Sequence, residues 1–356
     1  MFKVNINFLK TGMILAKAIY GSDGQILLNA GVIVKENYID KLIKLGISSL
    51  YIDTKETADI IIEDVICEQN RLEAKNMIRE TMNNVYMGGK INTKDVFRAV
   101  NNIVDDLLSK KDIILNLSDI KAVDDYTFGH SVNVCVLCLI TGIAMGYDRE
   151  KLEKLGIGAI LHDIGKIAIP EEILNKPEKL TDEEYEIIKT HPRLGYEIIK
   201  RNPSISSLSA VAVLTHHERY DGLGYPLGKK GQALHEFSKI LAIADVYDAL
   251  TSDRVYKKGI FPHEAIEYLV SMGKHQFDYE IVKIFALNVA CYPVGTIVAL
   301  STGDQGIVSE VNKSYPNRPK VRYLRNKEGE KYVEIVEVAL DTNPSITIIE
   351  VLENIE

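Results

Sequence analysis

The chain has 356 residues, enough for two or three domains, and its 46% hydrophobic and 26% charged residues are typical of a soluble globular protein. Its 42 Lys and Arg residues against 50 Asp and Glu give a net charge of −8, which argues against a broad basic face for duplex nucleic acid or an anionic membrane. A small anionic ligand in a locally positive pocket remains compatible with this balance.

Neither a signal peptide nor a membrane span is expected, because no apolar core follows the N-terminus. The longest apolar stretch, Val132 to Met145, is interrupted by Asn133 and Thr141 and is shorter than the roughly 20 residues that a span needs. The four cysteines are too scattered for a disulfide framework, and Cys135 and Cys138 are interpreted as buried core thiols. These features favour a cytoplasmic protein.

Residues 1–57 predict a small α/β module whose role the sequence does not reveal. Apolar runs at 13–20, 25–28 and 49–52 predict short strands, and a turn signal, Gly-Ser-Asp-Gly, separates the first two. Residues 35–45 have apolar positions at helical spacing, so one helix is expected between the second and third strands.

Residues 58–110 predict connecting helices. A charged helical pattern runs from Ala58 to Val85, Gly88 and Gly89 interrupt it, and a second amphipathic helix begins near Thr93. Two interpretations stay open for these helices: they connect the first module to the next, or they pair with a second copy of the chain in a homodimer.

Residues 111–290 read as a run of helices. Asp148 is a good N-cap, Thr181 begins a capping box with Glu184, and Pro192 suits a first helical turn. Further helices are expected at 205–217, 236–251, 262–272 and 278–289.

Residues 291–356 predict a small antiparallel β module, because β-branched runs alternate with turn signals. The expected strands are 296–300, 306–311, 320–324 and 346–351. The expected fold is therefore mainly α: an all-helical central bundle, a small α/β module at the N-terminus and a small antiparallel β module at the C-terminus.

The residues that point to chemistry are five of the eight histidines and two aspartates of the helical region. They are His130, His162, Asp163, His191, His216, His217 and Asp245. Each separation is about one helix and one connection, so each helix could bring one or two ligands to a common point. Imidazole and carboxylate groups bind divalent transition metals, and seven such groups suit two ions.

Taken singly, each of these histidines is more simply a capping or core residue. Asp245 is harder to dismiss, because it lies in an almost wholly apolar helix where a buried carboxylate needs a compensating charge or donor. Taken together, the seven residues favour a metal site in which Asp163, with two oxygens, could bridge two ions.

The sequence motifs around these residues resemble those of the HD-GYP proteins, a branch of the HD metal-dependent phosphohydrolase superfamily. The resemblance covers roughly Ile113 to Asn288. It rests on six segments in order: Tyr126-Thr-Phe-Gly-His-Ser131, His162-Asp-Ile-Gly-Lys166, Lys189-Thr-His-Pro192, His216-His-Glu-Arg-Tyr-Asp-Gly-Leu-Gly-Tyr-Pro226, Ala244-Asp-Val-Tyr-Asp-Ala-Leu-Thr-Ser-Asp-Arg-Val-Tyr256 and Gln276-Phe-Asp278.

The resemblance implies an HD-type metal-binding bundle that acts as a phosphodiesterase on cyclic di-GMP, a bacterial second messenger. Family members give linear pGpG and, in some cases, GMP, and they carry iron or manganese. Matched motif by motif, two ions are implied, with a bridging hydroxide as nucleophile. The first would take His130, His162 and Asp245, the second would take His191, His216 and His217, and Asp163 would bridge them.

Some family members hold a third metal through a carboxylate four residues before the first histidine. Here that position is Tyr126, so a two-metal centre is expected, although the nearby Asp124 and Asp125 leave the count open.

The same resemblance implies the residues that contact substrate. Lys166 would contact the scissile phosphate and assist catalysis with Asp163, and Tyr225 would hold the dinucleotide. Arg254 and Lys257, three apart, would share a helical face and form a fork for phosphate. Gly222 and Gly224 either let the loop approach a ligand or serve only a packed turn, and the sequence does not separate these.

Two rival functions stay open. An HD phosphohydrolase could act on another cyclic dinucleotide, because the substrate contacts do not identify the bases. A non-catalytic module could bind cyclic di-GMP for regulation, but its relatives have usually lost metal ligands, and here all seven are present.

Overall fold

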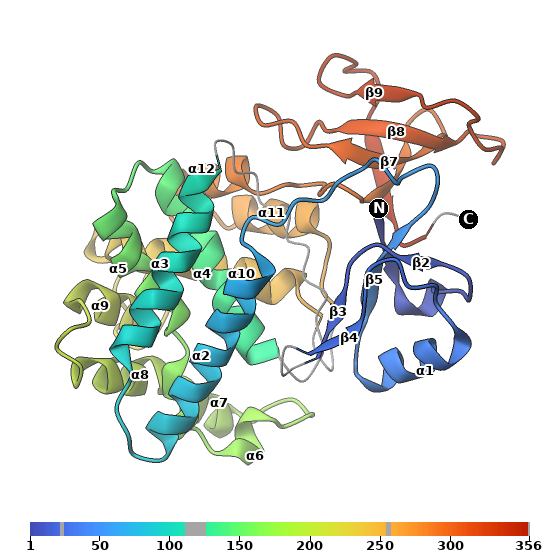
Figure 1. Cartoon of the computed structure of the whole chain (residues 1–356). Coiled ribbons are helices and arrows are strands. Elements are labelled where there is room, and N and C mark those ends of the chain that lie inside the picture. Colours follow the sequence, from blue (N-terminus) through green and yellow to red (C-terminus); the bar gives the residue numbers. More distant parts are fainter. Residues whose placement is uncertain (22–24, 111–125, 254–257, 355–356) are drawn as a thin grey trace.

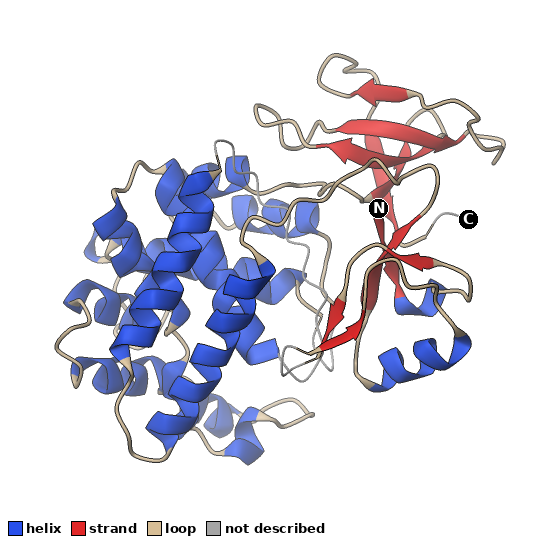
Figure 2. Cartoon of the chain, in the orientation of Figure 1, coloured by secondary structure: helices blue, strands red, loops and turns tan. Residues whose placement is uncertain are grey.

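The computed structural model describes residues 1–21, 25–110, 126–253 and 258–354. A helical bundle forms one side of the molecule, and strands from the two ends of the chain lie together on the other (Figures 1 and 2). The expectation of a mainly α fold with a small module at each end is confirmed.

The N-terminal module contains a three-stranded antiparallel sheet with the order β1-β5-β2. The sequence analysis did not predict the first strand, which is held in the sheet with Phe2 and Val4 buried. The strand expected over 13–20 is divided into two pieces, and the turn expected at 21–24 lies largely outside the described residues. The elements are β1 (Phe2–Asn5), the 3-10 helix η1 (Ile6–Phe8), β2 (Ile14–Leu15), β3 (Ile19–Tyr20), β4 (Ile26–Leu28), α1 (Glu36–Lys44) and β5 (Ser49–Asp53).

The helix expected from Ala58 begins only at Glu68, so that prediction was wrong for the first ten residues. The segment before Glu68 is irregular because its apolar side chains pack into different cores of the molecule. Ile60 packs in the core of the N-terminal module, and its carbonyl accepts a hydrogen bond from the Met1 amino group at 3.0 Å. Two helices then follow, α2 (Glu68–Tyr86) and α3 (Thr93–Ser109).

The central bundle follows the predicted helices closely. Asp148 caps its helix by accepting a hydrogen bond from the Lys151 amide, and Thr181 and Glu184 form the predicted capping box. The elements are α4 (Tyr126–Ala144), α5 (Arg149–Ile160), the 3-10 helix η3 (Ile164–Ala168), α6 (Glu171–Leu174), α7 (Asp182–Ile188), α8 (His191–Lys200), α9 (Ser207–Thr215), the 3-10 helix η4 (Gly231–Ala233), α10 (Glu236–Thr251), α11 (Pro262–Ser271) and α12 (Tyr279–Asn288).

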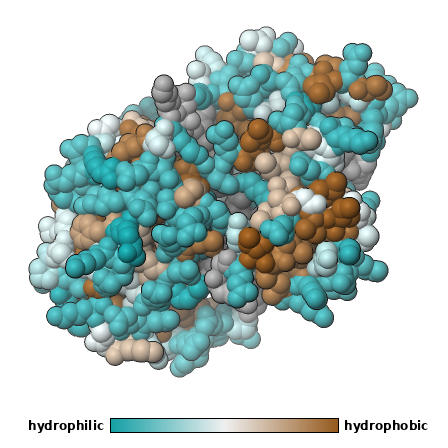
Figure 3. All heavy atoms as spheres, in the orientation of Figure 1, coloured by the Kyte–Doolittle hydropathy of each residue, from teal (hydrophilic) through white to brown (hydrophobic). Residues whose placement is uncertain are grey.

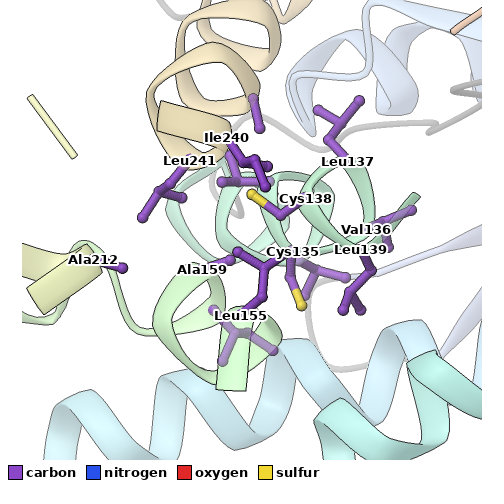
Figure 4. Packing of buried hydrophobic residues seen from close by; sticks show 14 of the residues in the cluster. Cys135, Val136, Leu137, Cys138, Leu139, Leu155, Ala159, Ala212, Ile240 and Leu241 are labelled. Atoms are coloured by element: carbon purple, nitrogen blue, oxygen red, sulfur yellow. The ribbon is translucent and has the colours of Figure 1, made fainter. Parts of the chain in front are cut away.

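Helix α4 is the centre of the bundle's core. Cys135 and Cys138 are completely buried among Leu155 and Ile240, which confirms their interpretation as core thiols (Figure 4). Residues of α2 and α3 belong to the same core, so the predicted connecting helices also complete the bundle. Among the described residues, α4 holds the one stretch long and apolar enough to cross a membrane, Thr127–Ala144, and 78% of it is buried inside the protein.

The C-terminal module is a five-stranded antiparallel sheet with the order β10-β6-β7-β8-β9. Four strands match the prediction, and β9, only three residues long, was missed. Its strands are β6 (Ile297–Leu300), β7 (Gln305–Glu310), β8 (Lys320–Arg325), β9 (Glu337–Ala339) and β10 (Ile348–Leu352). Ile297, Ile307 and Leu324 pack into the core of the N-terminal module, so the two ends of the chain share an apolar interior.

Apolar side chains also remain on the surface of the N-terminal module. Figure 3 shows them gathered over β2 and β4, where Ile14, Ile26 and Leu27 are each at least 40% exposed.

Arg322 of the C-terminal module donates to the Glu56 carbonyl at the end of the N-terminal module, at 3.0 Å, and should stabilise the contact of the two modules. Its buried guanidinium binds both oxygens of Asp59, at 2.6 and 2.7 Å, and Glu337 at 2.9 Å. Because Arg322→Ala removes the hydrogen bonds of this buried guanidinium to Asp59 and Glu337, we expect the free energy of local opening of β8 to fall by about 1–3 kcal/mol. Amide hydrogen exchange measures this. Lys320→Ala removes an exposed ion pair on the same strand and should change it by less than about 1 kcal/mol.

Candidate metal centre

The structure brings all seven predicted metal-ligating residues to one place in the helical bundle. Two of them lie inside the long helices α4 and α10, and the other five lie at or just beyond the ends of shorter helices. His130 lies on α4 and Asp245 on α10, His162 and Asp163 follow α5, His191 begins α8, and His216 and His217 follow α9.

The first group of candidate ligands is His130, His162 and Asp245. One ligand atom from each lies within 4.8 Å of the others. The Asp245 Oδ1 atom is 3.1 Å from His130 Nε2 and 4.0 Å from His162 Nε2. Two imidazole nitrogens and a carboxylate oxygen at this separation could hold a divalent transition metal.

The second group is His191, His216 and His217, whose ligand atoms also lie within 4.8 Å of one another. The Nε2 atoms of His191 and His216 are 3.3 Å apart. Three imidazoles facing one point form a second candidate metal site.

Asp163 lies between the two groups and turns one oxygen toward each. Its Oδ2 atom is 3.3 Å from His162 Nε2 in the first group, and its Oδ1 atom is 3.4 Å from His191 Nε2 in the second. Asp163 Oδ1 and His162 Nε2 are buried without a hydrogen-bond partner. Buried polar atoms are rarely left unpaired, so this donor set fits two cations bridged by the carboxylate.

Backbone carbonyls orient three of the histidines. The Nδ1 atoms of His162, His191 and His216 lie 2.7–2.8 Å from the carbonyl oxygen three residues earlier. Each of these carbonyls lies near a helix end, where carbonyls lack an intrahelical partner. With Nδ1 protonated and donating, Nε2 presents its lone pair to the centre.

Burial and charge set the protonation of the ligands. Burial lowers the pKa of His216 well below its ordinary value and that of His217 to about 4, so both imidazoles are neutral at pH 7. Burial opposes the ionisation of Asp163, but His162 and Lys166 outweigh it and hold the pKa low. Burial likewise opposes a charged His130, but hydrogen bonds to Asp245 and Asp248 raise its pKa to about 9.

Lys166 is placed one turn beyond Asp163 and contacts it directly. Its Nζ atom is 2.6 Å from Asp163 Oδ2, and the side chain is 29% exposed. The ammonium group therefore lies at the edge of the two candidate sites, where an anionic substrate would approach.

A close approach of two glycines holds Asp163 against His191. A Cβ atom on Gly165 would lie 2.0 Å from the His191 carbonyl oxygen and 2.5 Å from the Gly195 nitrogen. Glycine at this position therefore allows η3 to pack on the start of α8.

Gly165→Ala should consequently disturb the centre without replacing a candidate ligand. We expect the free energy of unfolding to fall by about 1–3 kcal/mol, because backbone must move to admit the methyl group. Thermal and denaturant unfolding measure it. The control is Gly129→Ala on α4, where the new Cβ meets Lys75 at an ordinary 3.6 Å, and which should be neutral or stabilising by up to about 1 kcal/mol. Equal losses in both variants would contradict this account of η3.

The predicted substrate contacts are only partly described. The Tyr225 ring lies over His217, with centroids 4.8 Å apart. A Cβ on Gly224 would meet the backbone of His217 to Arg219 at 2.4–2.5 Å, and one on Gly222 would meet Lys230 at 3.0 Å. Close packing within the loop thus explains why glycine stands at both positions.

Arg254 and Lys257 lie outside the described residues, as do Asp124 and Asp125, and the side chain of Tyr126 is not described. The predicted phosphate fork and the third-metal position therefore stay predictions.

The sequence analysis missed Asp248, which contacts His130 Nδ1 at 2.8 Å. The sequence does contain a signal for this residue. Asp248 follows Asp245 by three residues in the same apolar helix, so the two carboxylates lie on the same side of that helix. Asp248 also lines a cavity of about 220 Å³ where α10 meets both terminal modules.

Comparison with known proteins gives matches over most of the chain. Residues 117–281 match a family model described as an HD domain, and residues 297–356 match one described as a KOW domain associated with an HD domain.

A cyclic di-GMP phosphodiesterase of Pseudomonas aeruginosa is 35% identical over 72% of this chain and 61% of its own length. A cyclic di-GMP phosphodiesterase of Borreliella burgdorferi is 33% identical over 56% of this chain and 52% of its own. A 3'3'-cGAMP-specific phosphodiesterase of Vibrio cholerae is 32% identical over 53% and 36%. The chain thus spans between about a third and three fifths of the length of these relatives.

Proposed function

The chain belongs to the HD-GYP family, and from this premise we propose that it is a phosphodiesterase that hydrolyses cyclic di-GMP with two divalent metal ions. One observation carries the proposal: two groups of three candidate ligands face each other across the buried carboxylate of Asp163. The names of the two relatives above support the choice of substrate.

In this proposal His130, His162 and Asp245 hold one ion, His191, His216 and His217 hold the other, and Asp163 bridges them. Two such ions supply a strong nucleophile at neutral pH and neutralise charge on the phosphodiester. A histidine-rich set with carboxylates suits iron or manganese better than magnesium, which prefers oxygen ligands. The residues themselves keep the site buried and pre-organised.

Lys166 and Tyr225 would bind the substrate. The Lys166 ammonium leaves Asp163 Oδ2 for a non-bridging phosphate oxygen and stabilises the charge that develops there. The Tyr225 ring extends the surface of His217 and offers a face for the dinucleotide. Arg254 and Lys257 stay in the proposal as the phosphate fork, and Gly222 shapes the loop.

The organisation of the whole chain is part of the proposal. Residues 111–290 would be the catalytic domain, 58–110 the connecting helices, and 1–57 and 291–356 terminal modules without an assigned ligand. We place the protein in the cytoplasm, and a homodimer through α2 and α3 remains the alternative to a purely connecting role.

A second candidate is hydrolysis of another cyclic dinucleotide, favoured by the cGAMP-specific relative from Vibrio cholerae. Regulation without turnover is disfavoured because no candidate ligand is missing from the site. The test incubates iron- or manganese-loaded protein with cyclic di-GMP, cyclic di-AMP and 3'3'-cGAMP and follows products by chromatography. We expect cyclic di-GMP to be hydrolysed faster than the other two substrates, with linear pGpG as its product. Faster hydrolysis of another substrate, or turnover of none, would refute the proposal.

A further inference from the structure

His130 differs from the other candidate ligands in how its second nitrogen is held. It lies within α4, where the carbonyl three or four residues earlier serves the helix itself. A free backbone carbonyl accepts the hydrogen bond from Nδ1 in His162, His191 and His216, which lie at helix ends. No such carbonyl is available to Nδ1 of His130. Another element must supply the acceptor.

Asp248 on α10 supplies that acceptor. Its Oδ2 atom is 2.8 Å from His130 Nδ1, and its side chain is 1% exposed. An ionised carboxylate only accepts hydrogen bonds, so His130 Nδ1 carries a proton and donates it to Asp248. The other nitrogen, Nε2, lies 3.1 Å from Asp245 Oδ1 and is the one that faces the first group of candidate ligands.

Neighbouring side chains fix the carboxylate in turn. Asn133, one turn beyond His130 on α4, donates from Nδ2 to Asp248 Oδ1 at 2.9 Å. Arg71 of α2 donates to the Asn133 oxygen at 3.3 Å, which sets the orientation of the amide. All four side chains are at least 95% buried. This chain of contacts ties the first metal group to three helices.

We propose that Asp248 is a positioning residue for the first metal site, acting through His130. A carboxylate is a stronger acceptor than a carbonyl, so it raises the donor strength of the imidazole and fixes its ring. The second group has backbone acceptors for two of its histidines and does not depend on Asp248. The two sites are therefore built differently, and loss of Asp248 affects one of them. The inference rests on the proposed function only in assuming that the two groups bind metal.

The test is a metal titration and needs no turnover. Metal-stripped wild type, Asp248→Asn, His130→Ala and the double variant are titrated with Mn²⁺, and free Mn²⁺ is followed by electron paramagnetic resonance. Asparagine keeps the shape of the aspartate and removes its charge. We expect two equivalents in wild type, and in Asp248→Asn a weakening of one equivalent by about 10–100-fold with the other unchanged.

The control is Asp253→Asn, which removes a half-buried carboxylate just beyond the end of the same helix, bound to Ser48 and to the Gly259 amide. It should bind two equivalents like wild type. Because Asp248 acts through His130, adding Asp248→Asn to His130→Ala should change nothing further.

Three results would overturn the inference. Unchanged binding of both equivalents in Asp248→Asn, equal weakening of both, or additive effects in the double variant would each show that Asp248 does not act through His130. Failure of wild type to bind Mn²⁺ would instead overturn the metal centre itself. Two tight sites in wild type without hydrolysis of cyclic di-GMP would refute the proposed function and leave this inference standing.

Discussion

Replacing Asp163 by alanine should lower the turnover of cyclic di-GMP by roughly 10³-fold, or about 4 kcal/mol of transition-state stabilisation. Asp163 turns one oxygen toward each ligand group, at 3.3 Å from His162 Nε2 and 3.4 Å from His191 Nε2. Its removal takes away the carboxylate between the two ligand groups and deprives Lys166 of its partner. The measurement is kcat with metal-loaded protein, together with metal content.

The matched control for this variant is Asp105→Ala. Asp105 is an exposed carboxylate on α3 paired with Arg149, so its loss should leave turnover within about twofold of wild type. Circular dichroism should show folded protein in both variants. Substantial turnover in folded Asp163→Ala would mean that Asp163 does not bridge the centre.

Removal of the metal ions should abolish activity and destabilise the helical bundle. Metal that binds the folded protein at 100 times its dissociation constant adds about 2.7 kcal/mol. We therefore expect chelation to lower the melting temperature of the bundle by about 5–10 °C. The effect arises because His162 Nε2 and Asp163 Oδ1 are buried in the centre without a hydrogen-bond partner.

Readdition distinguishes the class of metal. Fe²⁺ under anaerobic conditions, or Mn²⁺, should restore both turnover and melting temperature, whereas Mg²⁺ should restore neither, because five of the seven candidate ligands are imidazoles. Differential scanning calorimetry and product chromatography measure the two effects. Full activity in chelator, or full recovery with Mg²⁺ alone, would contradict the proposed centre.

Much of this arrangement could be predicted because it depends on local signals. Helix boundaries at Asp148 and Thr181 follow from capping, which involves residues within one turn. The candidate ligands were identified because histidines and aspartates recur at helix-length intervals, and a buried carboxylate such as Asp245 has few structural explanations.

The rest depends on contacts between distant segments. The irregular segment before Glu68 is fixed by the N-terminal module, with Ile60 in that module's core, and no local pattern encodes this. Asp248 acquires its role only when α10 packs on α4 and brings its carboxylate to His130. The glycines of the 222–224 turn were ambiguous for the same reason: the backbone they pack against is visible only in the fold.

The central claim is that two metal ions lie on either side of the Asp163 carboxylate. Anomalous X-ray diffraction from crystals of manganese- or iron-loaded protein tests it most directly. The account predicts two anomalous peaks, one among His130, His162 and Asp245 and one among His191, His216 and His217, with Asp163 between them. A single peak, or peaks away from Asp163, would contradict it.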